Sequence, residues 1–468
     1  MTAIITDKLK KTLANSIFDE LQGTKIGDSD NYFSIAIGRS QQYDPVANND
    51  TATTPTNTDR EEKEFRYNMQ SVKAVEAFSF AVPLHSWTSN TIYSAYSDNV
   101  VGQPATSYYV KTDDNNVYVC ISTGKSAVGV TQVSTVKPDH TNSTLTKETD
   151  GYIWKYIYTI TTAAANSFLT SEFMPVGYID SAANTDPTYT QYLAQQAAVK
   201  GQIVGYRVTN SGGPYSSAPA ITIAGNGTGA KARSILNTSG GIAAIEVGDS
   251  ANAPIVSSLG QNYNYGTVSI NATTLGAGGT TATAVPMMGP VDGLASNATN
   301  DLRSTNIMFN IKPSGDVSGK WITGNDYRQI ALVKNLTEYD SSGKLTAAAG
   351  NALKKTTLTT QPGAGAISYA ADVELLGATS GSKAWLDFYD DSNTLWWHQD
   401  EYTGFGDFTD GENITVEGYT ASTLTVDSAL QKPDLDIFSG DLLYIDNRAT
   451  ATTRDVGQTE DIKVVIKL

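Results

Sequence analysis

The first apolar positions of the chain recur with a helical period. Within residues 6–22, which Thr6 or Asp7 can cap and Gly23 closes, large apolar side chains appear every three or four positions, at Leu9, Leu13, Ile17, Phe18 and Leu21. This spacing places them on one face of a helix. The pattern therefore predicts an amphipathic N-terminal helix.

The period changes to two in the segment that follows. In "NYFSIAIGRS" the apolar side chains alternate as Phe33, Ile35 and Ile37, which predicts a strand that ends at Gly38. Residues 41–62 are polar and rich in turn formers, so we expect an exposed loop there. A second short helix is predicted near 63–77.

Strand patterns continue from residue 79 to residue 160. The segments are "FSFAVPL", "SYYVKT", "NVYVCIST" and "GYIWKYIYTI". Between the second and the third, the run Asp113-Asp114-Asn115-Asn116 has the composition of a hairpin turn. In the last segment Tyr and Trp side chains occupy one face, and Ile side chains lie largely on the other. Both faces should therefore be buried, by the domain core on one side and by a second layer or a partner on the other.

A different composition begins near Gly201. Over the next ninety residues or so charged side chains almost vanish, and "IVGYRVTNSGGPYSSAPAITIAGNGTGAKA" is echoed by "IAAIEVGDS…GQNYNYGTVSINATTLGAGGTTATA". Each copy holds alternating strands separated by glycine turns. A degenerate repeat of this length predicts a stacked or paired β module over 199–297.

The run Gly225-Asn226-Gly227-Thr228-Gly229 inside this module resembles a phosphate-binding loop only in composition. A phosphate loop needs a helix behind it, because the N-terminus of that helix supplies aligned N–H groups. Here strand-like segments lie on both sides, and no Gly-Lys-Ser/Thr follows. We interpret the run as a hairpin turn.

The remaining patterns complete the predicted organisation. "STNIMFNIKPSG" and "NDYRQIALVKNL" are strand-like, residues 339–364 are loop-like, and several short strands separated by turns follow. The predicted fold class is mainly β, a β-rich α+β layout with a sandwich-like core, an N-terminal helix and two inserted small all-β modules. The predicted boundaries are 1–198, 298–364 and 433–468 for the core, 199–297 for the Gly/Thr-rich insert and 365–432 for the second insert.

Composition narrows the class of protein. A chain of 468 residues is long enough for two to four domains, and 25 Tyr and 40 Gly favour strands and turns. The charged N-terminus lacks the apolar stretch of a signal peptide, so we expect a protein that acts without secretion and outside membranes. A net charge of -16 argues against binding to a phosphate backbone. The single cysteine, Cys120, excludes internal disulfides, and we expect it to be a small buried side chain.

Candidate catalytic chemistry is sparse. The three histidines, His85, His140 and His398, lack metal-ligand spacing. Two acidic turns, Asp390/Asp391 and Asp407/Asp410, could hold calcium, although acidic turns are common without a metal. No residue pair is marked for glycoside cleavage, and we expect neither a cofactor nor a catalytic site.

The adjacent pair Trp396-Trp397, with His398 and Tyr402 nearby, has two readings. Aromatic rings can stack on sugars, but neighbouring strand residues point to opposite faces. One Trp should therefore lie in the core and the other should be exposed. An exposed aromatic side chain on a strand more often anchors a protein partner than a sugar.

Four motifs in order resemble a known family. They are "SIAIGRSQQY" after the N-terminal helix, "GYIWKYIYTI" after "VYVCIST", "NDYRQIALVKNL", and "GDLLYIDNRA…QTEDIKVVIKL" at the end of the chain. Together they resemble the baseplate wedge subunit of T-even-like contractile-tailed bacteriophages, the product of gene eight. The resemblance covers about the first 180 residues, 300–338 and 437–468. The two β inserts depart from it.

The resemblance implies a non-enzymatic structural protein of the virion tail baseplate, assembled in the host cytoplasm. It implies a homodimer that joins other wedge proteins, the products of genes six, seven and ten, without nucleic acid or membrane contact. Strands with large side chains on both faces suit this role, because association removes apolar area from water. The predicted interface residues are Arg39, Trp154, Tyr156, Tyr158, Phe173 and Arg448, and packing in the core is the alternative for each. The alternative function is a tail protein that binds host-surface glycans through its β inserts.

Overall fold

The fold was analysed in a computed structural model of the chain. The structure describes residues 5–22, 31–44, 47, 49–100, 107–248, 258–313, 320–346, 348–359, 369–389, 393–419, 424–455 and 457–468. The chain divides into two compact units. Unit 1 comprises residues 1–15, 79–308 and 467–468, and unit 2 comprises 16–78 and 309–466. Strands predominate over helices in both, so the predicted mainly β class is confirmed.

The predicted N-terminal helix is present as α1 (Asp7–Gln22), and the N–H of Leu9 donates to the Thr6 hydroxyl at its start. The second helix, α2, spans Asp59–Tyr67 rather than the predicted 63–77. Thr58 caps it by accepting a hydrogen bond from the Glu61 N–H. This cap moves the helix start forward, and the segment after Tyr67 is needed as a sheet strand. No helix among the described residues is both long and apolar enough to cross a membrane.

Unit 2 is built on a five-stranded antiparallel sheet. Its strand order is β21 (Ala349–Asn351), β2 (Met69–Ala74), β1 (Phe33–Gly38), β20 (Asp326–Lys334) and β28 (Asp441–Thr453). All six residues of β1 are buried, although its sequence alternates. The strand pairs with β2 on one side and β20 on the other, so it lies inside the sheet.

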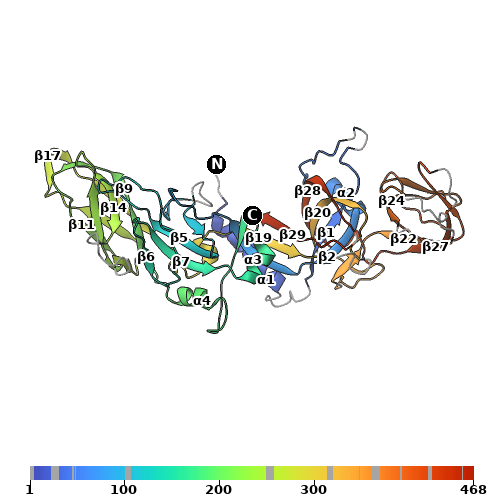
Figure 1. Cartoon of the computed structure of the whole chain (residues 1–468), viewed down its shortest axis with the longest axis horizontal. Helices are drawn as coiled ribbons and strands as arrows, with labels where there is room; N and C mark the ends of the chain where they lie inside the picture. Colours follow the sequence, from blue (N-terminus) through green and yellow to red (C-terminus); the bar gives the residue numbers. More distant parts are fainter. Residues whose placement is uncertain are drawn as a thin grey trace. The chain divides into compact units, whose positions relative to one another are not determined.

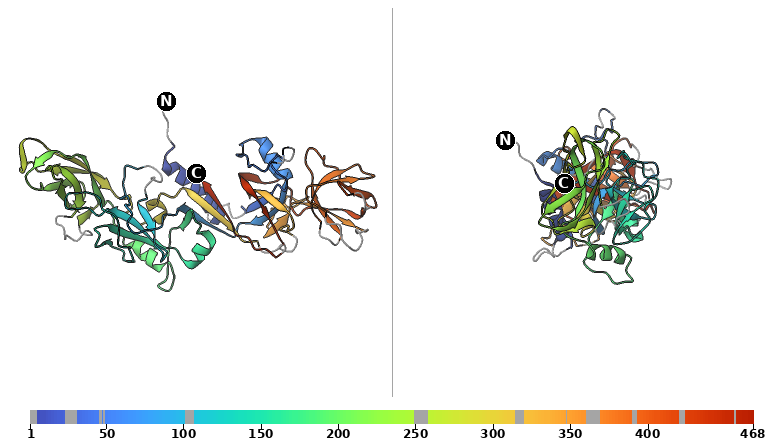
Figure 2. Two further views of the ribbon diagram at one scale, coloured as in Figure 1. Left: turned by 45° about the horizontal axis from the view of Figure 1, so that its top comes forward. Right: turned by 90° about the vertical axis from the view of Figure 1, so that its left-hand side faces the viewer.

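The second half of unit 2 contains a closed six-stranded barrel (Figure 2, orange to brown in the left-hand view). Its strands, in order around the barrel, are β22 (Lys354–Leu358), β25 (Thr394–His398), β24 (Lys383–Tyr389), β23 (Glu374–Gly377), β26 (Asn413–Val416) and β27 (Leu424–Gln431). The barrel has a core of its own, which includes Leu375, Leu386 and Trp397. Its first strand and β21 fall within 339–364, which we had expected to be a loop.

Unit 1 contains a four-stranded sheet in the order β4 (Tyr109–Lys111), β5 (Asn116–Ser122), β7 (Ile153–Thr159) and β6 (Leu145–Lys147). The hairpin predicted at residues 113–116 joins β4 to β5, with Asn115 at φ 63°. The first six residues of β7 are buried, as expected for a strand with two covered faces. The helices of this unit after α1 are α3 (Thr162–Phe168), α4 (Tyr189–Gln196) and α5 (Ala298–Asp301).

A further four-stranded sheet has the order β29 (Ile462–Lys467), β19 (Asn306–Ile311), β3 (Ala77–Pro83) and β8 (Phe173–Val176). The boundaries between the two units fall inside α1, β3, β19 and β29. The ranges that we predicted as one interrupted core are thus distributed over both units, and the predicted domain boundaries stay predictions.

The described part of the Gly/Thr-rich segment, where Figure 1 labels β9, β11, β14 and β17, folds as ten strands. They pair in mirror order, β9 with β18, β10 with β17, β11 with β16, β12 with β15 and β13 with β14. The strands are β9 (Ile203–Asn210), β10 (Gly213–Tyr215), β11 (Ile221–Gly225), β12 (Thr228–Ala230), β13 (Ala232–Leu236), β14 (Ile242–Val247), β15 (Leu259–Gln261), β16 (Gly266–Ile270), β17 (Leu275–Thr280) and β18 (Thr283–Met288). They enclose one hydrophobic cluster around Ile203, Tyr215 and Ile242. The two sequence copies therefore pair with each other.

This pairing corrects the predicted hairpin at residues 225–229. The glycines do lie between strands, but β11 and β12 pair with two different partners, β16 and β15, and not with each other. The run therefore connects β11 to β12 without pairing them as a hairpin. Gly227 fits there because a Cβ would meet ring carbons of Tyr263 at 2.4 Å.

Candidate functional site

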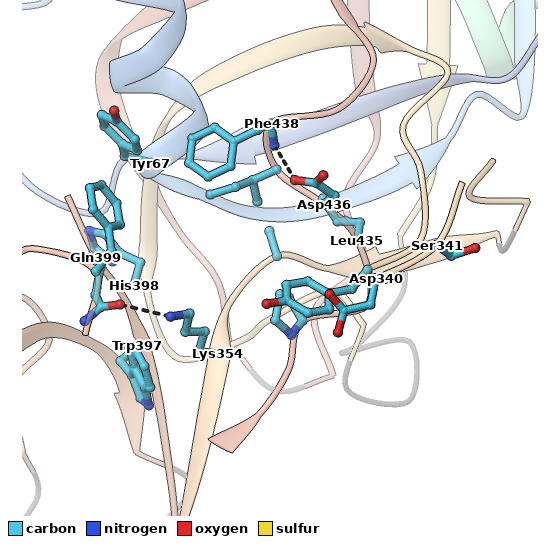
Figure 3. A pocket seen from close by; sticks show the side chains of 15 residues that line it. Tyr67, Asp340, Ser341, Lys354, Trp397, His398, Gln399, Leu435, Asp436 and Phe438 are labelled. Atoms are coloured by element: carbon cyan, nitrogen blue, oxygen red, sulfur yellow. Dashed lines mark hydrogen bonds between the residues drawn. The ribbon is translucent and has the colours of Figure 1, made fainter. Parts of the chain in front are cut away.

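Unit 2 contains a pocket of about 680 Å³ between the barrel and the five-stranded sheet (Figure 3). This volume falls in the range that small-molecule and side-chain binding sites usually occupy. The lining is largely apolar and includes Tyr67, Tyr339, Phe405, Leu435, Ile437 and Phe438. We regard this pocket as the candidate site and describe it from its elements upward.

Three aromatic rings that are distant in sequence form one wall of the pocket, the aromatic wall. Tyr67 is the last residue of α2, Phe405 lies in the loop after β25, and Phe438 lies between β27 and β28. The Tyr67 ring centroid is 5.4 Å from that of Phe405 and 5.9 Å from that of Phe438. The two Phe side chains are nevertheless 52% and 56% exposed.

Helix α2 holds the segment that carries Phe438. The guanidinium of the buried Arg66 donates to the carbonyl oxygens of Ile437 (2.8 Å), Ser439 (2.6 Å) and Gly440 (2.9 Å). Asp436 Oδ1 accepts from the Phe438 N–H at 2.9 Å (Figure 3). Backbone and side-chain hydrogen bonds therefore define the position from which Phe438 projects.

The loop that carries Phe405 is also ordered internally. Asp400 Oδ1 accepts from the N–H groups of Tyr402 and Thr403, both at 2.9 Å, and Gln399 Nε2 donates to the Gly406 carbonyl at 2.7 Å. Asx turns of this kind are typical of rigid surface loops. Phe405 thus sits on a fixed loop in the half-exposed position that the structure shows.

The polar side of the pocket is occupied by groups that already bind one another. Lys354 Nζ donates to Gln399 Oε1 at 3.0 Å, as Figure 3 shows, and to Asp407 Oδ1 at 2.8 Å. Asp340 pairs with Lys432 at 2.6 Å. Asp436 differs, because the described part of the chain offers it no ion-pair partner.

One residue that lines the pocket, His398, belongs to a buried ionisable pair. His398, at the end of β25, places Nδ1 2.6 Å from Asp387 Oδ2, and both side chains are almost fully buried. Burial by itself lowers the pKa of His398, but the carboxylates of Asp387, Asp372 and Asp400 together outweigh burial, and the net pKa is raised. Nearby Asp372 has its pKa raised to about 6, chiefly by burial. These groups bind the barrel together rather than forming an open site.

The structure buries four of the predicted interface residues within unit 1. Trp154 and Tyr156 are fully buried, Tyr158 is 3% exposed and Phe173 is 9% exposed. The Tyr93 ring packs 5.6 Å from Trp154, and the Tyr158 hydroxyl donates to the Pro175 carbonyl at 2.6 Å. The chain itself therefore supplies the second layer over β7. This burial matches the core alternative, and the interface role stays a prediction.

The two predicted arginines lie together in unit 2. Arg39, at φ 61° after β1, places its guanidinium 4.9 Å from the Tyr43 ring centroid, and the Tyr43 hydroxyl donates to the Arg448 carbonyl at 3.2 Å. The side chain of Arg448 is exposed on β28. The structure thus brings both to one surface, while their interface role stays a prediction.

The Trp pair behaves differently from our expectation. Trp397 lies in the barrel core, where its Nε1 donates to Thr356 Oγ1 at 2.9 Å. Trp396 points to the other face, as expected, but it is only 9% exposed and packs against Ile322 and Leu353. The expected exposed Trp is therefore absent, because the sheet side of unit 2 covers the outer face of β25 at this point.

The remaining candidate residues, the cysteine and the acidic turns, have separate surroundings. Cys120 is buried, as predicted, and burial raises the pKa of its thiol. Asp407 is paired with Lys354, and Glu412 accepts from the N–H groups of Thr379 and Ser380. The described residues contain no group of three or more His, Cys, Asp or Glu side chains arranged to hold a metal ion. Asp390 and Asp391 lie outside the described residues.

Sequence reasoning missed the aromatic wall. A usable signal was present, since Phe405 stands between Gly404 and Gly406, and Phe438 precedes Ser439-Gly440. A large apolar side chain inside a turn is not placed in the core by strand periodicity. Comparison with known proteins finds no family model that matches the chain and no similar curated protein.

Proposed function

We propose that this chain is a non-enzymatic structural subunit of a phage tail baseplate wedge, which dimerises and joins other wedge proteins during tail assembly in the host cytoplasm. Two lines of reasoning support the proposal. The four ordered motifs resemble the gene-eight family. In addition, the described part of unit 2 holds apolar rings in an exposed position.

The aromatic wall is the observation that carries the assembly role. Phe405 and Phe438 remain about half exposed although hydrogen bonds hold both loops. Contiguous apolar surface on a folded protein is typical of a binding surface, because water contact with it is unfavourable and a partner relieves that contact. The polar groups beside it form ion pairs and hydrogen bonds with one another, an arrangement suited to positioning rather than to proton transfer.

The proposal is tested with the purified chain and with virions of the phage that encodes it. We expect sedimentation equilibrium to give a dimer, and a density map of intact tails to place the chain in the baseplate. Tail-less particles from the same lysate serve as the control and should lack the protein. A strict monomer that is absent from purified tails would contradict the proposal.

A second candidate is binding of a host-surface glycan through the barrel insert, and one observation favours it. Tyr402 is 69% exposed, and its ring stacks on Trp385 with centroids 5.6 Å apart and an interplanar angle of 17°. An exposed aromatic ring that stacks on a half-buried one offers a flat face to a sugar. We expect Tyr402→Ala to leave tail assembly intact and to lower phage adsorption to cells if this function is correct, whereas unchanged adsorption would remove it.

A further inference from the structure

The pocket in unit 2 has polar groups whose interactions are already largely made within the chain. Lys354 binds Gln399 and Asp407, and Asp340 binds Lys432. A ligand rich in hydroxyl groups, such as a saccharide, would have to compete with these interactions. It would gain no hydrogen bonds from Phe405 or Phe438. These paired groups therefore offer such a ligand little that is new, although Asp436 and the buried His398 Nε2 retain unused hydrogen-bonding capacity.

The apolar side of the pocket, in contrast, lacks a cover. The Tyr67 ring contacts the Phe405 ring in a tilted arrangement and the Phe438 ring edge to face, and the buried Leu435 and half-buried Ile437 also line the pocket. A bulky apolar side chain inserted here would touch several rings at once and remove two half-exposed Phe side chains from water. Pockets that receive one large side chain in this way commonly supply much of the affinity of an interface.

The charge of Asp436 indicates a second feature of the molecule that binds in this pocket. Asp436 lines the pocket, half-buried, and within the described chain its Oδ1 accepts a hydrogen bond from the Phe438 backbone N–H. The lysines near the pocket are paired with other carboxylates, Lys354 with Asp407 and Lys432 with Asp340. Within the described chain Asp436 therefore lacks a cation, and a positively charged group from outside would complement it.

We propose that this pocket is a docking site for a segment of a partner protein, which inserts a bulky apolar side chain against the aromatic wall and places a neighbouring lysine or arginine beside Asp436. The inference rests on the proposed assembly role, because it names the place and the chemistry of one contact with a companion subunit. It also explains why α2 holds the Phe438 segment by three carbonyl oxygens. A rigid receptor loses less conformational entropy on binding.

The test uses the full chain and a defined probe, the dipeptide N-acetyl-Phe-Lys-amide, in an NMR titration. We expect the natural chain to bind this probe saturably. Its affinity for N-acetyl-Ala-Lys-amide should be about tenfold lower, and the affinity of Phe438→Ser for the Phe probe should also be about tenfold lower, which is the loss typical of removing an anchor contact. Asp436→Asn keeps the acceptor for the Phe438 N–H and removes the charge. We expect this variant to bind N-acetyl-Phe-Lys-amide and N-acetyl-Phe-Glu-amide equally, whereas the natural chain should prefer the lysine probe.

Controls separate binding from folding. Tyr265 is 63% exposed in unit 1, so Tyr265→Ser removes an exposed aromatic ring elsewhere and should bind the probe normally. Thermal unfolding of each variant should match that of the natural chain. If Phe438→Ser is destabilised, Phe405→Ser tests the same wall from a separate loop.

Three results would overturn the inference: no saturable binding of the lysine probe, equal binding of the alanine probe, or preferential binding of methyl glucoside or methyl N-acetylglucosaminide at the same residues. The proposed function is judged separately by the presence of the chain in tails. Failure of the probe with the chain still present in baseplates removes only the inference. Binding of the probe with the chain absent from tails supports the pocket chemistry and removes the baseplate role.

Discussion

At the scale of single residues, burial controls several ionisable groups. Asp301 in α5 is 1% exposed, and its carboxylate accepts from the Ala295 N–H at 2.7 Å. Burial raises its pKa to about 7, against the lowering effects of that hydrogen bond and of Lys155 and Lys11. The folded state therefore favours the protonated form. Between about pH 4 and about pH 7 the folded chain holds a proton that the unfolded chain releases.

This linkage predicts that unit 1 loses stability as the pH rises through that window. Asp301→Asn keeps an acceptor for the Ala295 N–H and removes the titration. We expect the variant to be more stable than the natural chain at pH 8, on the order of 1–3 kcal/mol, with little difference at pH 4. Hydrogen exchange followed by mass spectrometry of unit 1 peptides measures it, and parallel pH profiles of the two proteins would contradict the prediction.

His398 in unit 2 also has a raised pKa, but its protonated form is a cation, whereas protonated Asp301 is neutral. Its pKa in the folded chain is raised, so the stabilisation from its contact with Asp387 is fully present below the unfolded value and is lost as the pH rises through the folded value. We expect Asp387→Asn to cost roughly 1.5–3 kcal/mol at pH 6 and less at pH 9. Urea unfolding followed by Trp fluorescence measures this. A cost that does not change with pH would show that the pair is not charged.

At the scale of elements, one helix determines the geometry of a distant loop. Arg66 is fixed on α2 by Glu62, one turn earlier, which accepts from Nη2 at 2.7 Å and from Nε at 3.0 Å. Nη1 donates to the carbonyl oxygens of Ile437 and Ser439, and Nη2 also donates to that of Gly440. The planar fork of an arginine can hold several acceptors at once, and a single ammonium group cannot hold them in the same geometry.

We therefore expect Arg66→Lys to destabilise unit 2 by roughly 1–3 kcal/mol and to increase hydrogen exchange in residues 437–440. Arg60→Lys is the matched control on the same helix, because Arg60 is exposed and its ion pairs with Glu64 and Glu401 lie at the surface. We expect the control to leave the stability of unit 2 almost unchanged, because exposed ion pairs contribute little. Equal effects of the two substitutions would argue against the role of Arg66 as a clamp.

At the scale of the whole molecule, the chain contains several separate cores. The barrel encloses a cluster that includes the fully buried Leu386, and the mirror-paired module encloses another that includes Ile242. These clusters belong to different units, and strands of one do not pair with strands of the other. Folding free energy should therefore be distributed over more than one cooperative region.

The expected consequence is independent response to core mutations. Leu386→Ala should destabilise the barrel by about 2–5 kcal/mol, because it leaves a cavity, and hydrogen exchange in residues 203–288 should stay unchanged. Ile242→Ala is the reciprocal variant and should affect only its own module. A loss of protection in both modules from either substitution would mean that they unfold together.

Much of the local structure follows from near neighbours in the sequence. The period of apolar side chains located α1, the strand pattern of β7 and the hairpin between β4 and β5, because helix and strand sterics act over a few residues. The same reasoning identified the buried character of Cys120 and the mainly β class. It failed for α2, where the Thr58 cap and the need for β2 in the sheet outweighed the local pattern.

The local sequence pattern could not predict which distant strands pair. Nothing in the alternation of residues 203–288 distinguishes tandem stacking of two copies from their mirror-order pairing, since register depends on which strands meet in space. Trp396 is covered because residues from the sheet side of unit 2 reach it. The aromatic wall joins Tyr67, Phe405 and Phe438 from three remote segments. The linear pattern thus located many of the strands and helices. Only the packed chain determines which of their side chains remain at the surface, because exposure depends on what the rest of the chain covers.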